Sequence, residues 1–195
     1  MKTITLIVVL LGISVQTHAS ETHQHASPYA GQEDREIKNL SGSDIAELKR
    51  GGGWGLAKAA ELNGVPGPVH LLELKDEIKL SPNQVSIITQ VFEEMRVEAI
   101  AKGERLIALE RELEQNFSQR TITQDSLRAL LDQIGVARSE LRYVHLAAHL
   151  RMDDILAAEQ VEQYNRLRGY TSANPCSQIP KGHDPVMWRK HNGCE

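Results

Sequence analysis

The feature that most constrains the fold is a pair of long apolar stripes separated by a short polar segment. Apolar residues recur at steps of mostly three and four from Val85 to Phe117, and again from Leu127 to Ala148. This spacing places them on one face of an α-helix. Two long helices joined by a short link form an antiparallel hairpin. We expect each helix to extend for roughly 40–50 Å at 1.5 Å per residue.

Signals for helix ends agree with this hairpin. Ser81-Pro82-Asn83-Gln84 supplies an N-cap serine, a proline at the first helical position and a glutamine at the third, which together form a capping box. Thr123 can cap the second long helix. A final helix is expected from about Ala157 to Arg168, with Gly169 where a glycine commonly ends a helix. Because strand signals are nearly absent, we predict an all-α fold with shorter helices flanking the hairpin.

Composition favours helix packing and argues against a nucleic-acid-binding protein. Aromatic residues make up 4% of the chain, which suits aliphatic helix packing better than a sandwich or a barrel. The 22 Lys and Arg residues are outnumbered by 26 Asp and Glu residues, whereas nucleic-acid-binding proteins usually carry a basic excess. One hairpin buries a single seam, so we expect a homodimer that covers more apolar surface.

The first residues have the pattern of an export signal. Lys2 gives a positive start, Ile4 to Val15 forms an apolar core, and Thr17-His18-Ala19 is a small-x-small cleavage pattern. We therefore predict a signal peptide over residues 1–19, cleaved after Ala19, and a periplasmic protein in an oxidising compartment. The alternative, an uncleaved membrane anchor, has an apolar run that is short for a membrane span.

The rest of the chain divides where the composition changes. Residues 20–42 are polar without a clear period, and we expect a flexible N-terminal segment. Residues 43–68 are expected to hold short helices and a Gly/Pro-rich linker that includes Gly51-Gly52-Gly53-Trp54-Gly55. This glycine run is not a phosphate-binding loop, because no Gly-Lys-Ser/Thr follows it. Residues 69–169 form the predicted hairpin domain, and residues 170–195 form a C-terminal tail.

The only two cysteines lie in that tail. In an oxidising compartment the default for Cys176 and Cys194 is one disulfide. It would close a loop rich in turn-forming residues and stabilise the tail by up to about 3 kcal/mol. The alternative is a small Cys/His metal site, but the spacing matches no zinc pattern.

The second long helix carries a pair of histidines. His145 and His149 are four residues apart, so both imidazoles project from one face, a spacing that chelates metals on helices. When the hairpin folds, we expect Glu94 opposite His145, with Glu98 one turn away. His70, on a preceding short helix, could fold back as a further ligand. These nitrogen and oxygen donors suit a divalent transition metal: Zn, Cu, Ni or Co.

Other interpretations stay open. The two histidines could flank the packing seam, each hydrogen-bonded to a carboxylate, while Glu94 and Glu98 form a solvated face. His23 offers a second metal candidate, because cleavage after Ser20 would place it third in the mature chain, where amine, amides and imidazole suit Cu(II) or Ni(II). No His-Glu-x-x-His pattern, serine elbow or reactive-cysteine context is present, so we predict no enzymatic activity.

Two short motifs resemble a known family. Leu80-Ser81-Pro82-Asn83-Gln84 resembles the Leu-Thr-x-x-Gln signature of the Spy/CpxP group and of related periplasmic heavy-metal resistance proteins, and Leu156-Ala157-Ala158-Glu159-Gln160 is a weaker second copy. The resemblance covers roughly Val69 to Gly169. It implies a hooked four-helix hairpin, usually dimeric, in the periplasm. Members of this family include chaperones and metal sensors of the CnrX and ZraP type.

The metal-sensing branch is similar in one further respect. It takes ligands from a helix before the hairpin, from a Glu on the first long helix, and from a His-x-x-x-Met pair on the second. His70, Glu94 or Glu98, and His145 fill similar places here, with His149 in place of the Met. Two functions follow: a metal-binding resistance or sensor protein with an envelope signalling partner, or an ATP-independent envelope-stress chaperone that cradles unfolded client proteins.

Overall fold

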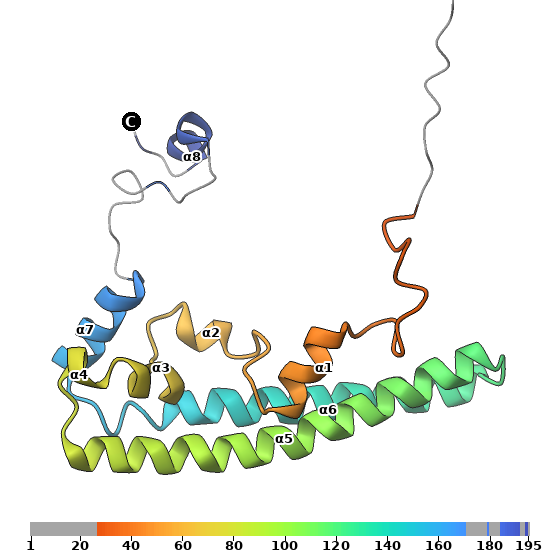
Figure 1. Ribbon diagram of the computed structural model, residues 1–195, viewed down its shortest axis with the longest axis horizontal. Coiled ribbons are helices and arrows are strands. Elements are labelled where there is room, and N and C mark those ends of the chain that lie inside the picture. The colour runs from red at the N-terminus through yellow and green to blue at the C-terminus, as the bar shows by residue number, and fades with distance from the viewer. Residues whose placement is uncertain (1–26, 171–178, 180–183, 192–193, 195) are drawn as a thin grey trace, which may run out of the picture. The chain divides into compact units, whose positions relative to one another are not determined.

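The computed structural model describes residues 27–170, 179, 184–191 and 194. Within these residues the regular structure is helical, which confirms the predicted all-α fold, and an isolated bridge joins Ile37 and Leu40. Residues 27–33 form turns in a unit separate from residues 34 onward. The helices are α1 (Gly42–Lys49), α2 (Lys58–Glu61), α3 (Pro68–Glu73), α4 (Lys75–Ile78), α5 (Pro82–Ser118), α6 (Gln124–Leu150), α7 (Ala158–Arg168) and α8 (Pro185–His191) (Figure 1).

Helices α5 and α6 pack side by side along their length as the long hairpin that the apolar stripes predict (Figure 1). Ser81 caps α5 in the expected capping box, and Thr123 caps α6 by accepting a hydrogen bond from the Ser126 amide. The seam is aliphatic, as the low aromatic content indicated. It buries Ile88, Val91, Ala99 and Leu106 of α5 against Leu130, Ala137, Leu141, Val144 and Ala148 of α6.

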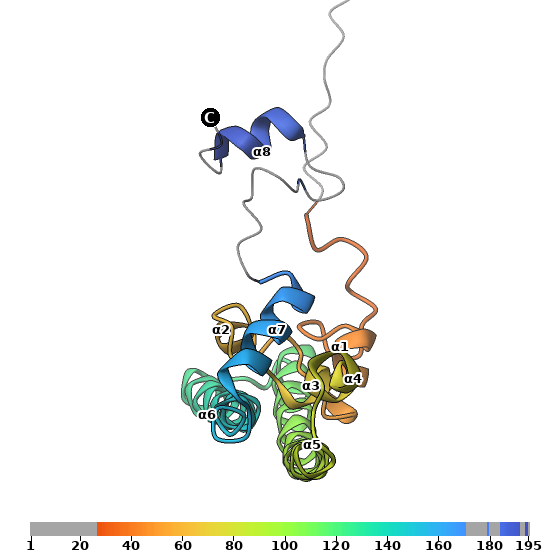
Figure 2. The same cartoon turned by 90° about the vertical axis from the view of Figure 1, so that its left-hand side faces the viewer.

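The short N-terminal helices cover one side of the hairpin. Helices α1 and α3 pack against α5, and α2 packs against α6 (Figures 1 and 2). The approach of α1 depends on Gly103, because a Cβ there would lie 2.7 Å from the Leu48 carbonyl oxygen. Residues 34–41, which showed no sequence period, also contribute to the core, since Ile37 and Leu40 are buried.

Helix α7 begins at the second motif copy. Its N-cap, Ala157, makes no side-chain cap, because alanine has no side-chain oxygen that could accept a hydrogen bond. The Gln160 side chain instead accepts a hydrogen bond from the Ala157 amide at 3.0 Å. Gly169 ends the helix with a φ of 74°, in the left-handed region where glycine is favoured.

Several predictions fall outside the described residues. The signal peptide over residues 1–19, the His23 site and Cys176 are among them, so the Cys176–Cys194 disulfide stays a prediction. Among the helices that are described, none combines the length and the apolar character needed to cross a membrane.

Candidate functional site

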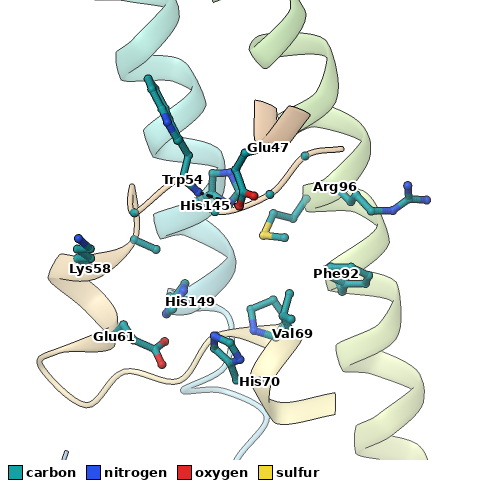
Figure 3. A pocket seen from close by; sticks show the side chains of 18 of the residues that line it. Glu47, Trp54, Lys58, Glu61, Val69, His70, Phe92, Arg96, His145 and His149 are labelled. Carbon is teal, nitrogen blue, oxygen red and sulfur yellow. Dashed lines mark hydrogen bonds between the residues drawn. The ribbon is translucent and has the colours of Figure 1, made fainter. Parts of the chain in front are cut away.

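One cavity of about 520 Å³ lies where the short helices cross the hairpin. It is bounded by α1, α2, the loop between them, the start of α3, and the facing sides of α5 and α6 (Figure 3). His70 of α3 and His145 and His149 of α6 all line it. The structure therefore gathers three of the five predicted ligands at one place.

His145 is the most buried of the three histidines. Its side chain lies on the seam of α6 beside Val144 and Ala148 and is 3% exposed. Its Nε2 atom is buried and has no hydrogen-bond partner among the described residues. Burial lowers the pKa of His145, and nearby His149 lowers it further, whereas Glu47 opposes the shift. The imidazole is therefore neutral near pH 7, the form that binds metals.

His149 lies one turn further along α6 and is held in a fixed orientation. Its Nδ1 lies 2.9 Å from the carbonyl oxygen of Val65. Because a carbonyl can only accept, Nδ1 carries a hydrogen, which in the neutral ring leaves the lone pair on Nε2. The ring lies against Gly67, where a Cβ would be 2.7 Å from its Nε2 atom. Glycine is thus required in Pro66-Gly67-Pro68, a segment that was predicted only as part of the Gly/Pro-rich linker.

His70 enters the cavity from α3 and is partly exposed. Its Nδ1 lies 2.8 Å from Oε2 of Glu73, one turn along the same helix. Since the carboxylate accepts, Nδ1 again carries a hydrogen, which in the neutral ring leaves the lone pair on Nε2. His70 and His149 are therefore both held through Nδ1.

The two predicted carboxylate ligands do not join the histidines. Glu94 and Glu98 are exposed, and neither is among the described residues that line the cavity. Glu94 accepts hydrogen bonds from Arg151 at 2.7 Å and from Gln90 at 2.8 Å. Both hydrogen bonds lower the pKa of Glu94, and the one from Arg151 has the larger effect. The pairing of the two long helices predicted how far along α5 Glu94 lies, but not which side of α5 it occupies. Met95, rather than Glu94, turns toward the seam.

Two other carboxylates line the cavity. Glu47 of α1 interacts electrostatically with His145, and the hydrogen bond from Arg50 is the main cause that lowers its pKa. Glu61 of α2 lies on the other side, near His70 and His149 (Figure 3). Neither carboxylate was predicted from the sequence, because short helices without an apolar period give no indication of which face turns inward.

Glu61 accepts hydrogen bonds from residues of α7 and from Tyr170, which follows α7. Its Oε1 atom accepts from the hydroxyls of Tyr164 at 2.6 Å and Tyr170 at 3.0 Å, and from Arg168 at 3.1 Å. Burial would raise the pKa of Glu61, but these donors outweigh it and the pKa is lowered. A charged carboxylate is therefore kept beside the cavity.

The glycine-rich run forms one wall of the cavity, a role that the sequence did not suggest. Gly51 has a φ of 71°, and a Cβ there would lie 2.8 Å from the carbonyl oxygen of Arg96. Trp54 has a φ of 43°, which is strained for a bulky residue. Its indole donates to Asp44 at 2.9 Å and lies 4.8 Å from the guanidinium of Arg138.

The cavity does not contain a closed coordination sphere. Within the residues that the structure describes, no three His, Cys, Asp or Glu side chains lie close enough to hold one metal ion. The three histidines therefore line one cavity without forming a three-ligand cluster among the described residues.

Comparisons with known family models, with curated proteins and with solved structures find no match to this chain. The resemblance to the Spy/CpxP group rests on the two motif copies and stays a prediction.

Proposed function

We propose that this protein binds a divalent transition metal, Zn, Cu, Ni or Co, in the histidine-lined cavity. The Nε2 atom of His145 is the observation that carries the proposal. It is a buried nitrogen without a partner among the described residues, beside a cavity large enough for an ion. An unsatisfied buried polar atom costs about 1–3 kcal/mol, and a metal ion would satisfy it.

The orientation of His149 supports the same proposal. Metal-binding histidines commonly donate their second ring N–H to a carbonyl or carboxylate, which fixes the tautomer and aims the ring. His149 donates from Nδ1 to Val65, and His70 does the same to Glu73. Both therefore keep Nε2 as the nitrogen available to an ion.

We take His145 and His149 as the first two ligands, and His70 and Glu47 as the candidates that complete the set. Because no three groups are preassembled, a further ligand has to move when the ion binds. His70 is partly exposed, and the guanidinium that holds Glu47 belongs to an exposed Arg50. Glu47 thereby takes the place expected for Glu94 and Glu98. The nitrogen-rich set suits the later transition metals.

The wider role that we propose is resistance to, or sensing of, heavy metals in the periplasm. The export signal, the homodimer, the hooked four-helix hairpin and an envelope signalling partner are parts of this proposal that rest on the sequence. A metal ion that binds one arrangement of the short helices better than another would shift their populations and so transmit a signal.

The test compares metal content in two proteins purified without a His tag. The wild type is expected to hold stoichiometric Zn, Cu, Ni or Co by elemental analysis after incubation and gel filtration. His145→Gln/His149→Gln is expected to hold none, and Ser139→Ala, an exposed position on the same helix, serves as the control. Circular dichroism checks that the double variant folds. Equal metal in the wild type and a folded double variant, or none in the wild type, would contradict the proposal.

An exposed apolar stripe on α6 favours a second candidate function, the ATP-independent chaperone. Val136, Tyr143 and Leu150 lie seven residues apart and are 59%, 72% and 64% exposed. Such a stripe is a possible binding surface for unfolded client proteins. Suppression of client aggregation, measured by light scattering, should then fall in Val136→Ser/Leu150→Ser and persist in the metal-site variant.

A further inference from the structure

The turn that shapes the histidine site is itself held by a distant helix. We call residues 61–67 the α2–α3 turn. This turn supplies the carbonyl of Val65 that accepts from His149, and Gly67, which leaves space for the imidazole. No residue of α7, all of which the structure describes, lines the cavity. Helix α7 nevertheless contacts the α2–α3 turn through Tyr164 and Asn165, in addition to the hydrogen bond from Arg168 to Glu61.

Tyr164 makes two of these contacts. It is fully buried, and its hydroxyl donates to Glu61 Oε1 at 2.6 Å. The backbone amide of Gly67 interacts with the same hydroxyl and opposes the rise in its pKa. Burial and the Glu61 carboxylate raise the pKa of Tyr164, so the hydroxyl remains a donor at physiological pH. One side chain of α7 thus ties together the two ends of the α2–α3 turn.

Asn165 makes a further contact. Its side-chain nitrogen donates to the carbonyl oxygen of Gly64 at 3.0 Å, one residue before Val65. Gly64 has a φ of 79°, and a Cβ there would lie 3.0 Å from the Asn165 amide nitrogen. The backbone that presents Val65 to His149 is therefore fixed from both sides.

We infer that Tyr164 and Asn165 are positioning residues for the His149 imidazole. They act through the α2–α3 turn, so docking of α7 sets the tautomer and the orientation of the His149 ring. No described hydrogen bond joins α7 to that ring. The consequence for metal affinity rests on the proposed function. Because coupling between two sites is reciprocal, metal binding at His149 then strengthens the docking of α7 to the same degree.

The first test needs no metal. Long-range ¹H–¹⁵N spectra of the full-length, metal-free protein report the tautomer of each histidine, and His149→Gln identifies the His149 signals. The wild type is expected to show His149 protonated at Nδ1. Tyr164→Phe and Asn165→Ala are expected to shift His149 toward a mixture of tautomers. Glu159→Gln, at an exposed position of α7, is the matched control and should leave the spectrum unchanged.

The second test measures affinity by titration with Zn²⁺, and with Co²⁺ followed by its visible absorption. Loss of the group that accepts directly from a metal-binding histidine lowers affinity by about 10- to 100-fold. Because Tyr164 acts on that group through the turn, we expect up to about tenfold weaker binding for Tyr164→Phe, with Glu159→Gln at the wild-type value. If Tyr164→Phe does not fold, Asn165→Ala and the isosteric Glu61→Gln take its place.

The outcomes separate this inference from the proposed function. A shift of the His149 tautomer in a protein that binds no metal supports the positioning role and contradicts metal binding. Metal binding by the wild type, with an unchanged His149 tautomer and unchanged affinity in the folded variants, overturns the positioning role and leaves metal binding in place. A tautomer shift without a change in affinity overturns the coupling to metal.

Discussion

The side-chain amides of Gln84 and Gln160 exchange two hydrogen bonds, from Gln84 Nε2 to Gln160 Oε1 at 2.8 Å and back at 3.1 Å. Each Oε1 atom also accepts the backbone N–H at the start of its own helix, from Ser81 at 2.9 Å and from Ala157 at 3.0 Å. The two residues hold the same place in the two motif copies. The repeated motif thus joins the beginnings of α5 and α7.

This pair should contribute measurably to stability. Gln84→Ala removes the hydrogen bonds that Gln84 makes with Gln160 and with the carbonyl of Ile155, and a lost, partly buried hydrogen bond typically costs about 1–2 kcal/mol. Urea denaturation should show this loss for Gln84→Ala and Gln160→Ala, and less than the sum for the double variant. Gln90→Ala, an exposed glutamine on the same helix, is the control. Additive losses would show that the two amides act independently.

Gly67 should tolerate no side chain. In Gly67→Ala the new methyl would lie 2.7 Å from the His149 ring, so either the ring or the backbone has to move. We expect a loss of about 1–3 kcal/mol in unfolding free energy, as for other overpacked sites, together with weaker metal binding. Gly53→Ala is the matched control, because a Cβ there meets no described atom within 4 Å. Thermal unfolding and Zn²⁺ titration of both variants measure the difference.

The metal-free protein should lose stability as the pH falls from 7 toward 5. The folded pKa of His145 is below its unfolded value, because burial and His149 disfavour the charged ring while Glu47 only partly offsets them. The unfolded chain therefore binds the proton first as the pH falls through about 6.5, and native stability decreases until the folded pKa is passed.

Urea denaturation at a series of pH values checks the sign. One proton contributes a slope of up to about 1.4 kcal/mol per pH unit, and the slope should flatten in His145→Gln. A slope of the opposite sign between pH 7 and 5, or the same slope in His145→Gln, would show that another group dominates.

Removing the exposed glutamates should not affect metal binding. Glu94 and Glu98 lie outside the cavity, so Glu94→Gln/Glu98→Gln is expected to bind Zn²⁺ with wild-type affinity. Glu47→Gln, which changes a carboxylate inside the cavity, is expected to weaken binding several-fold. Isothermal titration calorimetry measures the affinity of both variants. Weaker binding in Glu94→Gln/Glu98→Gln, with wild-type affinity in Glu47→Gln, would instead support Glu94 and Glu98 as the ligands.

The apolar periodicity and the helix-end signals predicted the long helices and where they begin and end. The stripes from Val85 and from Leu127, the caps Ser81 and Thr123, and the terminating Gly169 are local signals, and the structure has each of them. The spacing of four also predicted that His145 and His149 share one surface of α6, and both line the cavity.

The rest of the site depends on tertiary packing. Glu94 and Met95 are neighbours in sequence, and only the exact azimuth of α5 decides which of them turns inward. Glu47 and Glu61 lie on helices too short to show a period, and their inward faces are set by contacts with residues far along the chain. The orientation of His149 is fixed by a backbone carbonyl. Every residue has such a carbonyl, so the sequence does not indicate which one His149 contacts.

The hydrogen bond from His149 to Val65 joins residues 84 positions apart. On the ribosome, α1, α2 and the glycine-rich wall emerge before either long helix exists for them to cover. Helix α1 acquires a surface to pack on when α5 has been synthesised, and α2 only when α6 follows. Tyr164 emerges later still. The cavity is therefore among the last features to be completed during synthesis, and a fragment that starts at the hairpin would retain His145 and His149 without their enclosure.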